Sequence, residues 1–401
     1  MQKILLLAVL VLLFIPLVIA GLCFFSPTTK GNTATFEDQP LAQRILPLTS
    51  ALTLAQIKKE DGNITTLLVV KHEGETLQAV DLADIGAAHN TDIFAATAHL
   101  TLPTLIEAAA NETLVQRYEI KALLPSGGHF DRHVATGTNF IDHASETNSH
   151  QVFNFPKFGQ ATPARTTVAG IPDGLLDFEV EFCVRFDRDI RSAEDFDAAR
   201  KAFFLCADFT NRVTLVRLID PNNYNSGSGF SDAKSGPGFF PTGPFVVIPN
   251  DWQRFIANER MTTRVNGTAR QDARGSQMML DFRQLVERVL DSSQHPKEYL
   301  YQGNKTPLLL NGVIPKGAAL MSGTSAGVIF TPPTLCDKLA GVGSAIVHGQ
   351  ATSRNAVVAA VKEHFLQSQI KSGHFLQVGD VIEYGSSSMG DIRVEVRAPG
   401  S

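Results

Sequence analysis

An unbroken apolar segment near the N-terminus places the strongest constraint on how this chain can fold. Ile4–Phe25 spans 22 residues without a charged side chain, and a helix of that length matches the roughly 30 Å hydrocarbon core of a bilayer. The segment predicts a membrane span within residues 1–25, with cleavage near Ala20 as a signal peptide left open as the alternative. Lys3 precedes the segment and Lys30 follows it, which favours a cytoplasmic N-terminus. We therefore expect a membrane-anchored protein with its body on the exported side, or a secreted protein if the segment is removed.

The remaining sequence divides into a tether and two folded parts. Residues 26–40 are polar and rich in threonine, and they predict a flexible tether. Residues 41–122 alternate short apolar runs with turn signals at Lys59–Asn63 and Glu73–Glu75, which predicts a small β-rich N-terminal domain with a few helices. Residues 123–401 mix short strands, glycine turns and helices without an internal repeat. We expect this part to form one larger α+β domain that is mainly β.

Net charge and cysteine usage argue against two classes of protein. The chain has 35 Lys and Arg against 40 Asp and Glu, a formal charge of −5, which gives no basic footprint for nucleic acid. Its four cysteines, at positions 23, 183, 206 and 336, have neither a paired spacing nor the spacing of a metal finger. We therefore expect buried thiols and no disulfide scaffold.

The first sign of chemistry is a strand in which acidic and apolar residues alternate. In Leu175–Val184, the side chains of Asp177, Glu179 and Glu181 share one face, because side chains two apart in a strand point the same way. A strand with a solvated acidic face has the same pattern, so this pattern alone does not decide between a surface and a metal site. A third oxygen ligand would favour Mg²⁺ or Mn²⁺, and Asp208, at the end of an apolar run, is the candidate.

A histidine and a glutamate form a second candidate group. His143 and Glu146 are three residues apart, a spacing that on a helical turn lets the carboxylate orient the imidazole as a base. An ordinary pair of surface side chains has the same spacing and is the alternative. His129, Asp131 and His133 also alternate along the chain, but their context indicates a polar strand edge rather than a metal site.

Seven segments occur in the order found in the fumarylacetoacetate hydrolase family, and the chain resembles that family from about Pro125 to Val396. They resemble its lid motif, ExE metal strand, NDxxxRD turn, KSxxxxGPxGP loop, RVNGxxRQD hairpin, GTPAGV turn and final GDVIE strand. In that order, the segments are Gly137–Glu146, Phe178–Phe182, Ala207–Arg212, Lys234–Pro244, Arg264–Asp272, Gly323–Val328 and Gly379–Glu383. Each motif alone is a modest signal, whereas seven in order indicate membership of the family.

The resemblance implies a fold, a cofactor and a set of site residues. The fold is a roll of mixed β-sheets around a central cavity, usually dimeric, preceded by a small N-terminal domain. The cofactor is a divalent cation, Mg²⁺ with Mn²⁺ or Ca²⁺ as alternatives, bound by Glu179, Glu181 and Asp208. The implied catalytic residues are His143, Glu146 and Lys234, and the implied substrate-binding residues are Lys157, Arg212, Gln271 and Thr324.

The activity implied by the resemblance depends on stabilising an enolate or carbanion. Family members act on 2-oxo acids and 1,3-dicarbonyl compounds by hydrolytic C–C cleavage, decarboxylation or related lyase reactions. The resemblance thus implies a metal-dependent hydrolase or lyase of the acylpyruvate or fumarylacetoacetate type, in which Lys234 neutralises an oxyanion and His143 activates water. The alternatives are a sugar-acid dehydratase or decarboxylase of the same fold, and a binding or scaffold protein whose pocket has drifted.

The chain departs from the family pattern in two ways. After Arg212 the family continues with Asp, an aliphatic residue and Gln, whereas Val213–Leu215 stand here. Since that Gln normally helps hold the substrate carbonyl, the cleavage reaction of the namesake enzyme does not transfer directly. Two segments near residues 291–316 and 332–373 are inserted, and the second carries an apolar stripe over Ser353–Lys371 that predicts a helix. That helix would cover either the pocket or the edge of a dimer.

Overall fold

The structure is a computed structural model that describes residues 36–400, except residues 148, 150, 173, 221–222, 224–225 and 295–296. These residues belong to two compact units. The larger unit contains the described residues up to Ile329 and those from Phe375 onward, and the second contains Phe330–His374.

The localisation expected from the sequence needs correction. Between residues 36 and 400, as far as they are described, no helix combines the length and the apolar character needed to cross a membrane. Ile4–Phe25, the segment from which the anchor was predicted, lies outside the described residues. We therefore do not retain the membrane-anchored or exported assignment.

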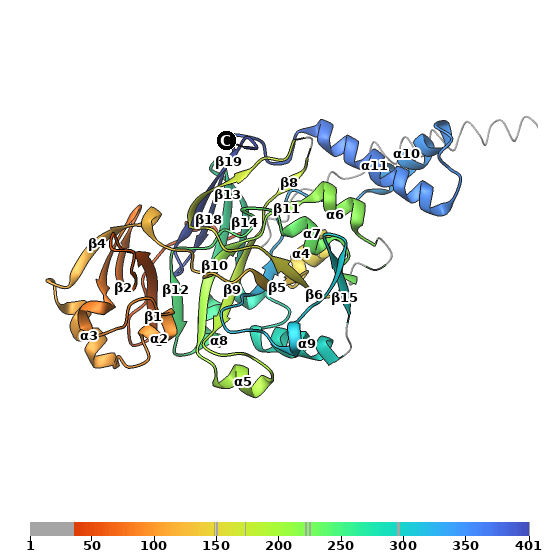
Figure 1. The fold of residues 1–401 in the computed structure, drawn as a ribbon. Helices are drawn as coiled ribbons and strands as arrows, with labels where there is room; N and C mark the ends of the chain where they lie inside the picture. Colours follow the sequence, from red (N-terminus) through yellow and green to blue (C-terminus); the bar gives the residue numbers. More distant parts are fainter. Residues whose placement is uncertain are drawn as a thin grey trace, which may run out of the picture. The chain divides into compact units, whose positions relative to one another are not determined.

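A ten-stranded sheet is the largest element of the larger unit (Figure 1). From edge to edge its strands are β4 (Val115–Glu119), β3 (Thr76–Asp81), β2 (Ile64–Glu73), β1 (Ala51–Lys58), β12 (Val246–Pro249), β10 (Lys201–Ala207), β9 (Val180–Phe186), β17 (Leu320–Thr324), β5 (Arg132–Gly137) and β6 (Phe153–Phe158). Neighbouring strands are antiparallel, except that β17 and β5 are parallel. The hairpins predicted at Lys59–Asn63 and Glu73–Glu75 are confirmed as the β1–β2 and β2–β3 connections.

The strands of the N-terminal region continue the sheet that carries the later strands. β1 pairs with β12 from Ala51 opposite Pro249 to Leu54 opposite Val246. This pairing satisfies the backbone groups of β12 that would otherwise form an exposed sheet edge. One sheet runs through both predicted parts, so the sheet does not mark a boundary between them. The division of the chain near residue 123 stays a prediction.

A second, five-stranded sheet and two short ladders complete the β-structure of the larger unit. The five-stranded sheet contains, in order, β14 (Thr268–Arg274), β13 (Arg260–Val265), β18 (Val381–Ser386), β19 (Asp391–Arg397) and β7 (Arg165–Ala169). The short ladders pair β11 (Thr210–Asn211) with β8 (Leu176–Asp177), and β15 (Glu298–Tyr301) with β16 (Asn304–Pro307). Two large mixed sheets with short helices agree with the α+β fold expected from the sequence.

Short helices connect the strands. The α-helices of the larger unit are α2 (Ile93–Ala96), α3 (Leu102–Ala110), α4 (Ile141–Glu146), α5 (Ala193–Ala198), α6 (Arg212–Leu218), α7 (Phe230–Lys234), α8 (Trp252–Asn258) and α9 (Phe282–Gln294). The 3₁₀-helices are η1 (Leu82–Ile85), η2 (Ile120–Ala122), η4 (Gly275–Gln277) and η5 (Leu310–Gly312). For the site, α4, α6 and α7 matter most, because each carries a residue that the sequence singled out.

Buried aromatic residues fix the central strands β9 and β10. The two strands pair along their whole length, from Phe186 opposite Lys201 to Val180 opposite Ala207. Phe182 and Phe203 have no exposed surface, and burying one phenylalanine side chain contributes about 1.5–3 kcal/mol to folding. The strands that carry the acidic residues are therefore held within the buried hydrophobic core.

The expectation of free thiols is wrong, because none of the described cysteines is a free thiol. Cys183 on β9 and Cys206 on β10 form a disulfide, with their Cα atoms 6.0 Å apart. Cys206 lies opposite Glu181 in the ladder, so the antiparallel register brings it beside Cys183. A sequence separation of 23 residues does not reveal this pairing, because the pairing depends on strand register rather than on spacing.

The second unit is a helical pair in the region predicted as the second insertion. It contains α10 (Leu335–Val347) and α11 (Arg354–Ser372), and α11 confirms the helix predicted over Ser353–Lys371. The two helices approach closely at Gly341, where an added Cβ atom would lie only 2.7 Å from Val361 Cα.

Candidate metal centre and active site

Three buried carboxylates from two adjacent strands meet at one point. One ligand atom each of Glu179, Glu181 and Asp208 lies within 4.8 Å of the other two. Glu179 directly precedes β9, and Asp208 directly follows β10, where its N–H donates to the Glu179 carbonyl oxygen at 2.9 Å. The exposed fractions of the three residues are 5 %, 0 % and 1 %. A solvated acidic face is thereby excluded, and the alternation in the sequence marks a buried acidic cluster.

A lysine bridges two of these carboxylates. Lys234, the last residue of α7, donates from Nζ to Glu179 Oε2 at 2.7 Å and to Asp208 Oδ2 at 2.8 Å. Burial alone would lower the pKa of Lys234, but the negative charges of Asp208 and Glu179 outweigh burial and raise the pKa. Lys234 is therefore a permanent positive charge at the centre of the cluster.

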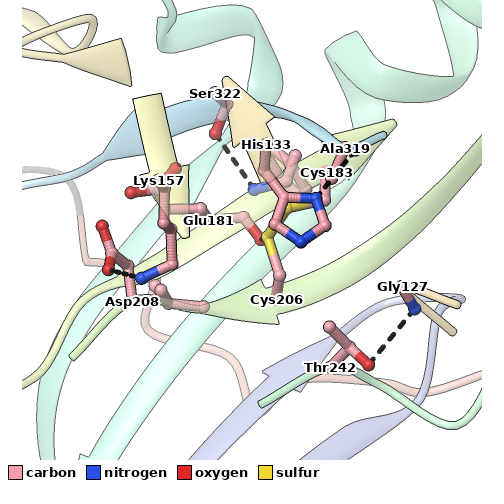
Figure 2. The surroundings of a disulfide bond; sticks show 12 residues. Gly127, His133, Lys157, Glu181, Cys183, Cys206, Asp208, Thr242, Ala319 and Ser322 are labelled. Atoms are coloured by element: carbon pink, nitrogen blue, oxygen red, sulfur yellow. Dashed lines mark hydrogen bonds and ion pairs between the residues drawn. A yellow bond between two sulfur atoms is a disulfide. The ribbon is translucent and has the colours of Figure 1, made fainter. Parts of the chain in front are cut away.

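Lys157 on β6 supports the cluster from another strand (Figure 2). Its Nζ donates to Asp208 Oδ1 at 2.6 Å and to the backbone carbonyl oxygens of Phe239 and Lys234. Its three N–H groups thus all have protein acceptors, and the residue has no exposed surface. The structure places Lys157 beside the cluster as a partner of Asp208, and its predicted contact with substrate stays a prediction.

Arg212 and a fourth carboxylate complete the ionic network. Arg212, at the start of α6, donates from Nε to Asp177 Oδ2 at 2.9 Å and from Nη2 to Glu179 Oε1 at 2.8 Å. Burial would raise the pKa of Glu179, but Lys234 and Arg212 outweigh burial and lower it. Asp177, to which the sequence gave no role, shares the strand face of Glu179, and this alternation is the signal that could have assigned it.

Glu181 is the carboxylate that the network leaves incompletely satisfied. Its Oε2 accepts from the Gly323 N–H at 2.8 Å, whereas its buried Oε1 has no hydrogen-bond partner among the described residues. Burial and the neighbouring charges of Asp208 and Glu179 raise the pKa of Glu181 well above its ordinary value. An oxygen atom without a partner, among three convergent carboxylates, is the feature expected of a hard cation site. The residues present therefore fit a divalent metal.

The His143–Glu146 pair lies on α4 and is tied to the same region. His143 Nδ1 and Glu146 Oε2 are 3.0 Å apart, and the Gly327 N–H donates to Glu146 Oε1 at 3.2 Å. After Lys234 and Arg212, a protonated His143 would also lower the pKa of Glu179. The short segment formed by the end of β17 and the turn after it thus contacts the acidic cluster through Gly323 and the histidine pair through Gly327.

Thr324 and Gln271 form a hydrogen-bonded pair next to Glu181. Gln271 Nε2 donates to Thr324 Oγ1 at 2.8 Å, and Thr324 Oγ1 donates to the Val180 carbonyl oxygen at 2.8 Å. Gln271 Oε1 accepts from the Val180 N–H, so these contacts hold the turn against β9. The predicted substrate contacts of both residues stay predictions.

Ser325 is a polar residue at this turn that the sequence did not single out. Its hydroxyl oxygen is buried and lacks a hydrogen-bond partner in the described part of the chain. The family motif has proline at this position, and the replacement of that proline by serine is the signal that could have drawn attention to it.

The comparison with known families agrees with this geometry. Residues 132–397 match the family described as fumarylacetoacetate (FAA) hydrolase C-terminal. The chain belongs to this family. Members of the FAA hydrolase family are generally enzymes, hydrolases or isomerases, and they usually use a divalent metal.

Two relatives found by sequence are described as uncharacterised proteins. An uncharacterised protein of Staphylococcus epidermidis is 28 % identical over 178 residues, which cover 42 % of this chain and 56 % of that protein. The chain thus spans little more than half the length of this relative. An uncharacterised protein of Staphylococcus aureus is 25 % identical over 262 residues, which cover 62 % of this chain and 82 % of that protein.

Solved structures show the same fold at low sequence identity. A fumarylacetoacetate hydrolase from Exiguobacterium antarcticum has a TM-score of 0.50 and 17 % identity, and the match covers 86 % of this chain and 99 % of that one. A structure described as a probable 2-hydroxyhepta-2,4-diene-1,7-dioate isomerase from Mycobacterium abscessus has a TM-score of 0.50 and 18 % identity, and covers 87 % and 100 %. At these identities, the likeness shows the FAA hydrolase fold and leaves the reaction open.

Proposed function

We propose that this protein is a divalent-metal-dependent hydrolase or lyase that acts on a 2-oxo acid or a 1,3-dicarbonyl compound. The observation that carries the proposal is the convergence of the acidic cluster and the His143–Glu146 pair on one glycine turn. A metal site and a candidate base in contact with one short segment can act on the same small substrate.

The acidic cluster suits a hard cation. Glu179, Glu181 and Asp208 would hold Mg²⁺ or Mn²⁺, because all three offer carboxylate oxygen and none offers nitrogen or sulfur. When bound, the cation would supply Lewis-acid polarisation of the 2-oxo-carboxylate end of the substrate.

His143 and Lys234 would perform the proton transfer and the charge stabilisation. With Glu146 accepting the Nδ1 proton of His143, Nε2 is left as the base that removes a proton from water. The hydroxide adds to the remote carbonyl carbon, and the C–C bond then breaks with its electron pair passing to the 2-oxo half as an enolate. The Lys234 ammonium stabilises that negative charge, and the proton held by His143 returns to the enolate carbon. The products are a carboxylic acid and a 2-oxo acid.

Access of substrate to the cluster requires a local movement. The carboxylates are almost completely buried, and α4 is a helix of six residues whose N-cap, Phe140, has no side-chain hydrogen bond to the helix. A short helix without a capping bond is among the least stable elements of a fold. We assign the opening movement to α4, which carries His143.

The test is a substrate panel with separate readouts. Purified protein with Mg²⁺ or Mn²⁺ is incubated with acylpyruvates, oxaloacetate and 3-deoxy-2-oxo sugar acids, and C–C cleavage, decarboxylation and dehydration are scored separately. Glu179→Ala and His143→Ala are expected to abolish turnover of whichever substrate reacts. His129→Ala, at an exposed histidine outside the cluster, is the matched control and should be fully active. Unchanged turnover in both cluster variants would contradict the proposal.

A binding protein with the FAA hydrolase fold is the second candidate. It is favoured by the observation that Lys157, Gln271 and Thr324 direct their polar atoms to other protein groups. Metal-free protein by elemental analysis, together with no turnover of any panel member by correctly folded protein, would favour this candidate.

A further inference from the structure

The disulfide lies within the two strands that carry the candidate metal ligands. Cys183 is two residues after Glu181 on β9, and Cys206 is two residues before Asp208 at the end of β10. Neither cysteine has any exposed surface. The bond therefore joins the two strands at the level of the acidic cluster, with no contact with solvent.

Strand alternation places the disulfide and two of the ligands on the same face. Cys206 lies directly opposite Glu181 in the antiparallel ladder, and residues opposite each other point to the same side of a sheet. Cys183 shares that side with Glu181, and Asp208 shares it with Cys206, because each pair is two residues apart. Figure 2 shows the bridging sulfur atoms next to Glu181, with Lys157 and Asp208 beside them.

Contacts around the bond connect it to the ligand backbone. Cys206 Sγ lies 3.4 Å from the backbone carbonyl oxygen of Glu181. On the far side of Glu181, β17 is attached to β9 through the Gly323 N–H bond to the Glu181 carboxylate. The part of β9 that carries Glu181 is thus held to β10 by a covalent cross-link at Cys183, and Glu181 itself is held to β17 by a hydrogen bond.

The disulfide opposes electrostatic repulsion between carboxylates on β9 and β10. Glu181 faces two other carboxylates, and it alone among the three has no lysine or arginine bonded to its side chain in the described chain. Like charges at this distance in a poorly polarisable interior repel strongly. When Glu181 is ionised, as a cation ligand must be, this repulsion pushes Glu181 on β9 away from Asp208 on β10, and a covalent bond between these strands opposes that movement.

We propose that the Cys183–Cys206 disulfide is a positioning element of the acidic cluster, which fixes the separation of Glu181 and Asp208 and so preorganises the metal site. The inference rests on the proposed metal-dependent function, and it adds a residue pair that holds the ligands without touching the metal. Residues that orient metal ligands typically affect metal affinity by about 10–100-fold.

The test compares metal affinity and stability in matched variants. Mn²⁺ binding to the metal-free full chain is measured by titration calorimetry for the wild type, for the double variant Cys183→Ala/Cys206→Ala, and for Leu205→Ala. Leu205 is buried on β10 but lies opposite Phe182, on the other face from the disulfide, so its variant reports loss of packing alone. Thermal unfolding without metal is recorded for each.

We expect the loss of Mn²⁺ affinity in the variants to differ from their loss of thermal stability. The double variant should bind Mn²⁺ at least about 10-fold more weakly, whereas Leu205→Ala should melt earlier but bind within twofold of the wild type. If the double variant does not fold, Cys183→Ser/Cys206→Ser supplies a second chain that lacks this bond and leaves the disulfide of Cys336 intact. Equal Mn²⁺ affinity with and without the bond would overturn this inference alone. Absence of Mn²⁺ binding by the wild type would overturn the proposed function as well.

Discussion

His133 gives the structure a defined sensitivity to acid. Its imidazole is 1 % exposed, with Nδ1 accepting from the Ala319 N–H at 3.1 Å and Nε2 facing the Gly159 carbonyl oxygen at 3.2 Å. Both bonds are made by the neutral ring with its proton on Nε2, and a second proton on Nδ1 would face another N–H. Burial, followed by the positive charge of Lys157, lowers the pKa of His133 from 6.5 to about 4.

This shift predicts the sign and size of a stability loss. Above pH 6.5 the imidazole is neutral in both folded and unfolded chains, so His133 has no effect on the pH dependence. Between pH 6.5 and pH 4 the unfolded chain takes up a proton that the folded chain does not, and stability falls as the pH falls. A difference of about 2.5 pKa units, at 1.36 kcal/mol per unit, corresponds to roughly 3 kcal/mol lost by pH 4.

Urea unfolding of the wild type and of His133→Gln between pH 7 and pH 4 measures this loss. Glutamine does not titrate in this range, and every other group is common to both proteins, so the difference between their unfolding free energies isolates His133. The variant should be the less stable protein at pH 7, and its deficit should shrink by about 3 kcal/mol on acidification to pH 4. Parallel pH profiles would refute the reasoning and would mean that the ring is solvated or carries its proton in the folded state.

Three further predictions concern the acidic cluster and the candidate base. Glu181→Gln should weaken Mn²⁺ binding by about 100-fold, since ligand charge sets cation affinity, without lowering the metal-free melting temperature, because one of three mutually repelling carboxylates is removed. Lys234→Met should lower the free energy of unfolding of the metal-free protein by about 3–5 kcal/mol, because it leaves Glu179 and Asp208 less well paired in the interior. Urea unfolding in saturating Mn²⁺ should show part of that loss restored. His143→Asn should lower kcat by about 10²–10⁴-fold in steady-state assays while calorimetric Mn²⁺ affinity stays within twofold; loss of metal binding would instead make the residue a ligand.

The sequence predicted the acidic cluster well because its signal is local. Glu179 and Glu181 share a face through strand alternation, and Asp208 ends the next apolar run, so the three carboxylates lie together at two neighbouring strands. The His143–Glu146 contact is equally local, since three residues of helix separate the two side chains. The α+β class followed from short strands, glycine turns and helices that intermix without an internal repeat.

What the sequence could not predict depends on strand register and on distant side chains. The disulfide requires the exact pairing of Cys206 with Glu181, and the same two cysteines in another register would be free thiols. The pairing of β1 with β12 joins segments almost 200 residues apart, and no local pattern indicates such a contact. The membrane-anchored assignment was drawn from apolar length alone, without regard to any packing of the chain.

The balance of charge in the cluster explains how such a site folds before it meets a cation. Asp177, Glu179, Glu181 and Asp208 are four buried carboxylates, and Lys157, Arg212 and Lys234 are three buried cations bonded to three of them. If all are ionised, one negative charge remains in excess, and geometry assigns it to Glu181, whose Oε1 has no partner among the described residues. The ammonium and guanidinium groups thus neutralise most of the negative charge of the site in the absence of metal. The remaining negative charge belongs to Glu181, where a bound cation would neutralise it. Because the three cations leave only this one carboxylate for an incoming ion to neutralise, the lysines and the arginine stabilise the buried cluster, and a bound ion would act on Glu181.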